Sequence, residues 1–297
     1  MVSENWAWLG VARGRFLPLT LSCVALGMAL AGGKSLATFD ALLVLLGALA
    51  AHVAVNALNE YGDFRSGLDL RTRRTAFSGG SGTLPSHPQW LVRALLLGLG
   101  ALLTCAAIGL YFLLRQPQLL ASLLPLGLAG LLLVLLYTPW LTRHPWLCLF
   151  APGLGFALMV LGTRIVLGGS ITAQDLLLTG APLLLCNNLL LLSQFPDLDA
   201  DRQSGRRTLP LWIGCRKALY IAIAQWLLAY GLLLGALALP GLRGAALGLL
   251  TVPLAVRAAW LLLPDPLEPR RLPPALGMNA AVSVGTPLLM ALGLALA

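Results

Sequence analysis

The sequence predicts an all-α membrane protein, with about nine transmembrane helices in a bundle around a central apolar cavity. Three observations support this fold class. Of the 297 residues, 58% are hydrophobic and only 10% are charged, whereas soluble domains average about 25% charged residues. Apolar stretches of roughly 18 or more residues recur along the chain, and each is long enough to span a bilayer as a helix. The basic residues also concentrate in alternate connections, as expected of a membrane protein.

The predicted spans follow one another with mostly short connections. They cover residues 16–33, 38–58, 91–114, 119–138, 146–167, 175–195, 217–239, 244–263 and 275–296. With a cytoplasmic N-terminus, fifteen Arg and Lys residues fall in inner connections and four (Lys34, Arg115, Arg164 and Arg243) in outer ones. We therefore expect an integral protein of the cytoplasmic membrane whose C-terminus lies outside. The same bias accounts for the net charge of +9, so nucleic acid is not needed as a partner.

The whole chain, residues 1–297, is predicted to form one domain. Its two long polar connections, 59–90 and 196–216, follow the second and sixth spans and lie on the predicted cytoplasmic side. This spacing of four helices suggests two related halves, at about 16–138 and 146–263, followed by a last helix at about 275–296. The five cysteines include no close pair, so we predict neither a disulfide nor a zinc site.

The first long connection begins with a stripe of polar residues. His52, Asn56, Asn59 and Asp63 recur at helical spacing, which places them on one face of a helix. Asp69 follows a glycine at which this helix is expected to end. The stripe therefore predicts a polar surface that continues from the membrane into the connection.

The second long connection contains a similar cluster. Asp197 and Asp201 are four residues apart and share a face if the segment is helical, whereas Asp199 points elsewhere. Pro196 can open a helical turn at this point or kink the preceding helix. Together the two connections contain six of the eleven acidic residues of the chain.

Carboxylates close to a membrane are normally paired or metal-bound, because an unpaired charge there is costly. Ion pairs with neighbouring arginines on ordinary loops are one explanation, but two clusters at corresponding positions favour a ligand site. Such oxygen ligands suit Mg²⁺, which typically bridges carboxylates to substrate phosphates. Arginines beside the clusters can hold phosphate oxygens directly, namely Arg71, Arg73, Arg74, Arg202, Arg206 and Arg207. A prenyl diphosphate would fit such a protein, because its diphosphate head can bind at the magnesium site and its hydrocarbon tail can lie among the apolar helices.

Both clusters resemble the motifs of the UbiA superfamily of intramembrane aromatic prenyltransferases, and most closely the menaquinone-pathway branch that acts on dihydroxynaphthoate. The family's first motif, N-D-Y-x-D-x-x-x-G-x-D, is similar to "NEYGDFRSGLD" at 59–69, where Glu60 replaces the usual aspartate. Its second motif, D-x-x-x-D followed by G-K-R-T-L, is similar to "DLDAD" at 197–201 and "GRRTL" at 205–209. A Tyr-Lys element of some relatives is only loosely matched by Tyr137 and Arg143 in "YTPWLTRHP". The acidic residue that relatives often carry early in the fifth span is missing, which leaves the acceptor in doubt.

The resemblance implies a Mg²⁺-dependent transfer of a polyprenyl group from a prenyl diphosphate to an aromatic acceptor, with 1,4-dihydroxy-2-naphthoate in menaquinone biosynthesis as the first candidate. It implies Asp63, Asp69, Asp197 and Asp201 as magnesium ligands, and Asn59, Asp63, Asp197 and Asp201 as catalytic residues. The expected diphosphate-binding residues are Asn56, Asn59, Arg71, Arg74, Arg143, Arg202, Arg206 and Arg207. Weaker candidates for the acceptor site or cavity wall are His52, Tyr137, Asn187 and Asn188.

Several alternatives remain at this point. The acceptor can be 4-hydroxybenzoate or another molecule, and a different class, an ion-coupled secondary transporter, also has intramembrane acids and duplicated halves. The position of the acids at one membrane face argues against transport. His52 can instead be a hydrogen-bonded core residue, and Asn187 and Asn188 can hold helices together. The segment "FSGGSGTLP" (77–85) can be an anion-binding nest, a flexible connection or a gate.

Overall fold

The computed structural model describes residues 6–32, 39–72, 74–75 and 78–297, and within these residues the regular elements are all helices. Eight helical segments of the described chain are long and apolar enough to cross a membrane. A shorter apolar helix, Gly14–Leu30, occupies the first predicted span. The all-α membrane fold is therefore confirmed, and the predicted spans correspond to these eight segments and the shorter helix. Lys34, Arg73 and Phe77 lie outside the described residues.

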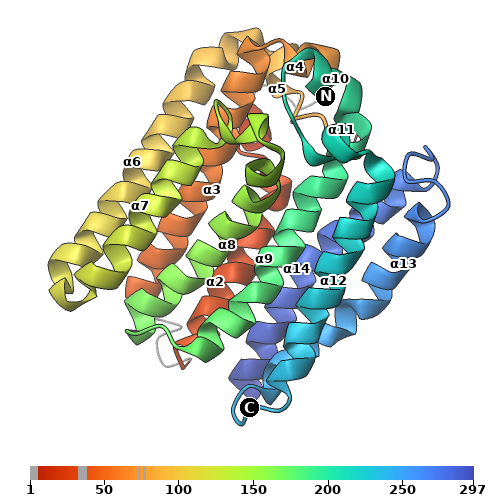
Figure 1. Cartoon of the computed structure of the whole chain (residues 1–297). Coiled ribbons are helices and arrows are strands. Elements are labelled where there is room, and N and C mark those ends of the chain that lie inside the picture. Colours follow the sequence, from red (N-terminus) through yellow and green to blue (C-terminus); the bar gives the residue numbers. More distant parts are fainter. Residues whose placement is uncertain (1–5, 33–38, 73, 76–77) are drawn as a thin grey trace.

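The principal helices are α2 (Leu17–Leu30), α3 (Phe39–Arg65), α6 (Leu91–Arg115), α7 (Leu120–Tyr137), α8 (Pro145–Gly168), α9 (Ala173–Ser193), α12 (Cys215–Ala236), α13 (Val252–Leu262) and α14 (Leu272–Leu296). Short helices in the connections are α1 (Ala7–Val11), α4 (Leu68–Arg71), α5 (Thr83–Ser86), α10 (Leu198–Gln203) and α11 (Leu209–Ile213). Figure 1 shows α4, α5, α10 and α11 together at one end of the bundle, with the C-terminus at the opposite end. Both long polar connections therefore fold over the same end of the molecule.

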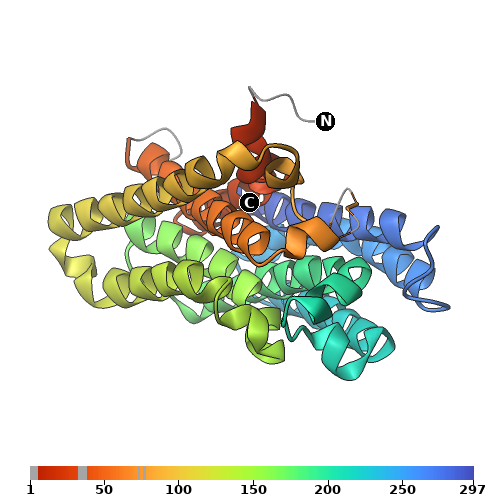
Figure 2. The ribbon, with the colours of Figure 1, turned by 90° about the horizontal axis from the view of Figure 1, so that it is seen from above.

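The helices differ in how much of their surface faces the outside. Only 11% of the apolar stretches containing α6 and α7 is buried within the protein, compared with 61% for the stretch containing α9. Helix α9 packs against α8, α12 and α14, while α3 packs against α6 and α2. Figure 2 shows α3 (orange) lying beside α6 (gold). The leucine-rich outer faces of α6 and α7 are consistent with contact with lipid, which does not penalise exposed apolar side chains.

Small residues allow the central helices to approach closely. A Cβ atom at Gly153 of α8 would lie 2.1 Å from the carbonyl oxygen of Leu183 in α9, and one at Gly27 of α2 would lie 2.6 Å from the carbonyl oxygen of Val160 in α8. These two glycines therefore bring backbones into direct contact. Such small-residue packing replaces the hydrophobic driving force that helices lack inside a bilayer.

A buried polar network joins α8, α9 and α12. Asn187 accepts a hydrogen bond from the backbone N–H of Gly153 (3.0 Å) and donates one to Gln225 (3.1 Å). Gln225 in turn donates to Asn188 (2.9 Å), which donates to the carbonyl oxygen of Ala222 (2.8 Å). Neither asparagine lines the cavity described below. The prediction that Asn187 and Asn188 form part of a substrate wall is therefore wrong, because their amides are used to hold helices together. The duplication into two halves stays a prediction.

Candidate active site

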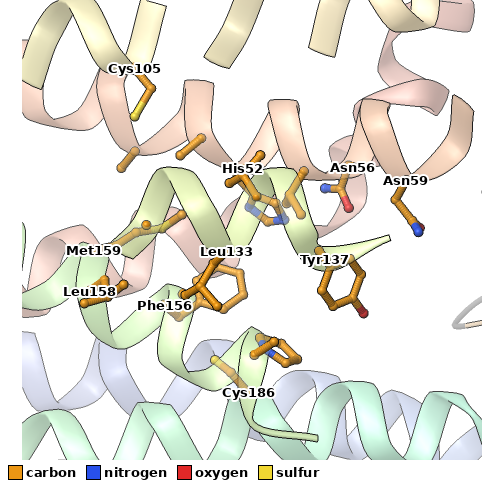
Figure 3. Close-up of a pocket in the computed structure, with 18 of the residues that line it drawn as sticks. His52, Asn56, Asn59, Cys105, Leu133, Tyr137, Phe156, Leu158, Met159 and Cys186 are labelled. Atoms are coloured by element: carbon orange, nitrogen blue, oxygen red, sulfur yellow. The ribbon is translucent and has the colours of Figure 1, made fainter. Parts of the chain in front are cut away.

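A cavity of about 540 Å³ extends from the polar end of the bundle into its apolar interior. This volume lies within the usual range for small-molecule sites. Helices α3, α6, α7 and α8 provide most of the apolar wall, and Figure 3 shows Leu133, Phe156, Leu158 and Met159 along it. The charged and amide-bearing residues at the polar end are Arg13, Arg15, Asn56, Asn59, Asp63, Asp69, Gln194, Asp197, Asp201 and Arg206. One space thus has a charged mouth and a long apolar body.

The first acidic cluster is presented by the last turns of α3. Because this helix continues to Arg65, the predicted stripe is regular and Asn56, Asn59 and Asp63 all line the cavity. Gly67 then adopts a left-handed conformation (φ 75°), which a residue without Cβ adopts readily. The reversal starts α4 and brings Asp69 to the cavity with only 2% of its surface exposed. The prediction that the helix ends near Gly67 is confirmed.

The second acidic cluster lies on a helical turn that Pro196 opens. The turn Phe195–Asp197 leads into α10, and both Asp197 and Asp201 line the cavity. Asp199 faces away: 92% of its side chain is exposed, and it lies 3.8 Å from Arg202. The predicted face shared by Asp197 and Asp201 is thus present.

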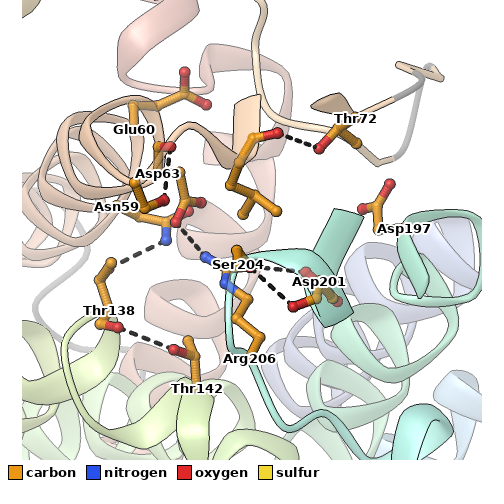
Figure 4. Close-up of polar contacts among 12 residues, drawn as sticks. Asn59, Glu60, Asp63, Thr72, Thr138, Thr142, Asp197, Asp201, Ser204 and Arg206 are labelled. Atoms are coloured by element: carbon orange, nitrogen blue, oxygen red, sulfur yellow. Dashed lines mark hydrogen bonds and ion pairs between the residues drawn. The ribbon is translucent and has the colours of Figure 1, made fainter. Parts of the chain in front are cut away.

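Arg206 connects the two clusters. Its guanidinium donates a hydrogen bond to Oδ1 of Asp63 in α3 and lies 3.6 Å from Oδ1 of Asp201 in α10, as Figure 4 shows. Although burial opposes its charge, the carboxylates of Asp63 and Asp201 raise the pKa of Arg206 above its ordinary value. This arginine is therefore charged at any physiological pH.

Arg13 is a site residue that the sequence motifs do not indicate, because it precedes the first predicted span and lies outside both acidic clusters. Its Nε donates to Oε1 of Glu60 (3.0 Å) and its Nη2 to Oδ1 of Asn59 (2.9 Å). Asn59 also donates to Thr138 Oγ1 at the end of α7 (3.1 Å). Arg13 itself has a positive φ of 51°, which is uncommon for a residue with a side chain. No local sequence pattern distinguishes it from its neighbour Arg15.

Glu60, which replaces the usual aspartate of the first motif, does not face the cavity. Its carboxylate accepts hydrogen bonds from the backbone N–H (2.7 Å) and hydroxyl (2.8 Å) of Ser81. In the same segment, the backbone N–H of Gly79 donates to Oδ2 of Asp197 (3.1 Å). Gly80 has a φ of 70°, and a Cβ there would lie 2.7 Å from Oδ1 of Asp69. The described part of the glycine-rich segment is therefore bonded to both acidic clusters rather than being an unattached connection.

The other residues predicted to bind diphosphate or to line the cavity lie either at the cavity or on the protein surface. Arg206 lines the cavity, whereas five other predicted arginines are exposed and do not line it: Arg71, Arg74, Arg143, Arg202 and Arg207. These five lie on the surface of the connections, where Arg74 donates a hydrogen bond to the carbonyl oxygen of Asp69 (3.3 Å). Tyr137 lines the cavity below Asn59 (Figure 3).

His52 also lines the cavity. Its Nδ1 lies 2.6 Å from the hydroxyl of Thr20 in α2, and its ring meets the edge of Phe156 at 5.2 Å between centroids. The hydrogen bond expected of a core histidine is therefore present, and the ring contributes to the cavity wall at the same time.

The donor set of the site fits Mg²⁺, although no three acidic, histidine or cysteine side chains among the described residues are close enough together to hold an ion as they stand. Arg206 lies between the carboxylates instead. Two buried oxygens, Asp69 Oδ2 and Asp197 Oδ1, have no hydrogen-bond partner among the described residues, which is unfavourable without a cation. Burial and the nearby Glu60 and Asp63 raise the pKa of Asp69 to about 8. Hard carboxylate oxygens in need of positive charge are the ligands that Mg²⁺ prefers.

Comparison with known proteins identifies relatives in sequence and in fold. The chain is 28% identical over 193 residues to the 1,4-dihydroxy-2-naphthoate octaprenyltransferase of Bacillus subtilis (strain 168), a match that covers 64% of this chain and 60% of that relative. The structure of a UbiA homolog from Aeropyrum pernix K1 matches 93% of this chain and 96% of that one with a TM-score of 0.70 and 21% identity. A UbiA homolog from Archaeoglobus fulgidus bound to DMAPP and Mg²⁺ matches 95% of this chain and 98% of that one with a TM-score of 0.61 and 13% identity.

At such identities the two structural matches establish the fold alone. The family assignment comes from the sequence, because residues 20–294 match the UbiA prenyltransferase family. That match covers the principal helices and both acidic clusters. This integral membrane protein therefore belongs to the UbiA prenyltransferase family.

Proposed function

We propose that this protein transfers a polyprenyl group from a prenyl diphosphate to an aromatic acceptor in a Mg²⁺-dependent reaction, and that the acceptor is 1,4-dihydroxy-2-naphthoate. One observation carries the proposal: the acidic clusters and Arg206 surround the mouth of the same cavity whose body is lined by apolar side chains. A diphosphate head and a hydrocarbon tail match these two parts. The name of the Bacillus subtilis relative supports the choice of acceptor.

The roles of individual residues follow from their positions. Asp63, Asp69, Asp197 and Asp201 would hold Mg²⁺, which when bound neutralises the diphosphate and makes it a better leaving group. Arg206 and Arg13 supply further positive charge at the mouth of the cavity and stabilise the charge that develops on the departing oxygens. Asn59 accepts a hydrogen bond from Arg13 and donates one to Thr138, and in this way it positions the guanidinium of Arg13 at the mouth of the cavity.

The reaction then proceeds in the apolar part of the cavity. The bond between C1 of the prenyl chain and the diphosphate oxygen breaks, and the electron pair leaves with the diphosphate. The electron-rich ring of the acceptor attacks C1, a new carbon–carbon bond forms, and the ring loses a proton. Apolar walls that include Leu133 and Phe156 exclude water, which would otherwise capture the allylic cation. His52 and Tyr137 are polar groups of this wall, and we propose that they contact the acceptor.

We further propose that the polar end of the bundle faces the cytoplasm and that the C-terminus lies outside. The proposal rests on the excess of arginine in the connections at that end. It would place the charged mouth of the cavity where soluble magnesium and diphosphate products are accessible.

The proposed reaction is tested with protein purified in detergent and incubated with Mg²⁺, a labelled polyprenyl diphosphate and 1,4-dihydroxy-2-naphthoate. We expect a labelled lipid product from the wild type and its loss on chelation and in the Asp63→Asn and Asp201→Asn variants. Asp199→Asn serves as the control, since this side chain is 92% exposed and outside the cavity. Product with 4-hydroxybenzoate only would keep the mechanism and correct the acceptor. Absence of diphosphate release with every acceptor would contradict the proposal and favour an ion-coupled transporter.

A further inference from the structure

The side chain of Arg206 occupies the point where the two acidic clusters meet. It bonds to Asp63 from one side and lies 3.6 Å from Asp201 on the other, while only 20% of its own side chain is exposed. The two carboxylates are nearly inaccessible to water, with side-chain exposures of 7% and 2%. Arg206 is thus their principal counter-charge, because Arg13 is committed to Glu60 and Asn59.

The local backbone directs this arginine inward. Gly205 has a φ of 77° and ends α10, after which the N–H of Arg206 donates to the carbonyl oxygen of Asp201 (3.1 Å). The next residue points the other way: the N–H of Arg207 donates to the carbonyl oxygen of Thr142 (3.1 Å), and its side chain is exposed. The left-handed glycine therefore selects one of two adjacent arginines for the site.

Arg206 contacts two of the four carboxylates that would hold a magnesium ion, Asp63 and Asp201. Each carboxylate has lone pairs that Arg206 does not use, but a guanidinium and a dication beside the same carboxylate repel each other, so the presence of one weakens binding of the other. Two further oxygens, on Asp69 and Asp197, lack a hydrogen-bond partner among the described residues, so the polar atoms of the site are not all satisfied with the arginine in place. A ligand that supplies a cation for the carboxylate oxygens and anionic oxygens for the guanidinium of Arg206 would satisfy both kinds of group at once.

We propose that Arg206 is a placeholder cation, which neutralises Asp63 and Asp201 in the ligand-free protein and gives them up to Mg²⁺ only when a diphosphate is present to receive its guanidinium. The inference rests on the proposed function, because it takes Mg²⁺ and diphosphate as the ligands. Arginine pairs with diphosphate oxygens as readily as with carboxylates. Magnesium binding and diphosphate binding are therefore coupled, and each strengthens the other by the same factor.

The coupling can be measured without a prenyl chain or an acceptor. Purified protein is titrated with Mg²⁺ in a calorimeter, alone and with inorganic diphosphate, and a titration without protein corrects for complex formation in solution. For the wild type we expect weak binding of Mg²⁺ alone and an affinity at least about 5-fold higher with diphosphate, the low end of typical coupling. In Arg206→Gln, Mg²⁺ alone should bind more tightly and raise the melting temperature more than in the wild type, while the increase with diphosphate should disappear.

Arg207→Gln is the matched control: it removes the same charge from the neighbouring position without touching the carboxylates, and it should behave as the wild type. Arg206→Lys keeps the charge but cannot contact two carboxylates as a planar fork. Its affinity for Mg²⁺ alone should lie above that of the wild type, and this variant decides the question if Arg206→Gln does not fold. The proposal is overturned if neither Arg206 variant binds Mg²⁺ alone more tightly than the wild type, or if the coupling persists unchanged in Arg206→Gln. Normal coupling in a protein that forms no prenyl product would instead contradict the proposed function and leave this inference standing.

Discussion

The substitution Glu60→Gln tests how the glycine-rich segment is fastened over the site. Glu60 is fully buried and accepts three hydrogen bonds, from Nε of Arg13 and from the N–H and hydroxyl of Ser81. Glutamine preserves the shape of the side chain but removes its charge. The partly buried cation of Arg13 would then lose its only ion-pair partner among the described residues, and Ser81 would lose two charge-assisted hydrogen bonds.

The expected loss of stability can be estimated from these contacts. Removing one partner of a buried ion pair typically costs 3–5 kcal/mol. We expect about 3 kcal/mol, near the lower limit, because the amide still fills the space and 21% of the Arg13 side chain is exposed. At about 2 °C per kcal/mol for a chain of this size, the melting temperature should fall by about 6 °C. The KM for prenyl diphosphate should also rise, since the same segment places the N–H of Gly79 on Asp197.

Thermal melting in detergent, followed by intrinsic tryptophan fluorescence, measures the effect on stability. Asp199→Asn is a suitable control because it removes a carboxylate from an exposed pair at 3.8 Å, and such pairs contribute at most about 1 kcal/mol. The reasoning would be refuted if Glu60→Gln melted within about 1 °C of the wild type, or if the control were destabilised as strongly.

Three further predictions follow from the structure. Burial raises the pKa of Asp69 to about 8 in the folded protein, whereas the unfolded side chain loses its proton near pH 4. Metal-free protein should therefore lose stability as pH rises from 6 to 7.5, and Asp69 contributes up to about 1.4 kcal/mol per pH unit. In a melting series recorded with chelator, Asp69→Asn should reduce this slope without abolishing it, because burial also raises the pKa of Asp197 to about 7. Gly127→Leu fills open space on the cavity wall and should reduce turnover of long prenyl chains more than turnover of short ones. Gly100→Leu also fills open space but lies away from the cavity, so it should not change this preference. If Gly127→Leu affected both chain lengths equally, the tail would not bind beside Gly127. Asn188→Ala should cost about 1–3 kcal/mol in denaturation experiments because it leaves the Nε2 amide of Gln225 without its acceptor, and a changed KM would contradict a purely structural role.

Much of the fold could be predicted from the sequence, because the signals are local. The length of each apolar stretch sets the number and position of the spans, and the predicted ranges agree closely with the helices. The polar stripe ending at Asp63 and the i, i+4 pair Asp197 and Asp201 were also predictable, since residues at helical spacing share a face whatever the helix packs against.

The choice among arginines was decided by the tertiary structure. The sequence places several of them beside the acidic clusters, but Arg206 reaches Asp63 across 143 positions of sequence, and a left-handed turn at Gly205 determines that it, rather than Arg207, points inward. Glu60 occupies the position of an aspartate in the family motif, yet it faces away from the cavity toward Ser81 and Arg13. Asn187 and Asn188 face other helices for the same kind of reason. Helical spacing determines which residues share a face. The direction of that face depends on packing between segments far apart in the chain, and there a buried charge such as Asp63 must lie next to a group of opposite charge such as Arg206.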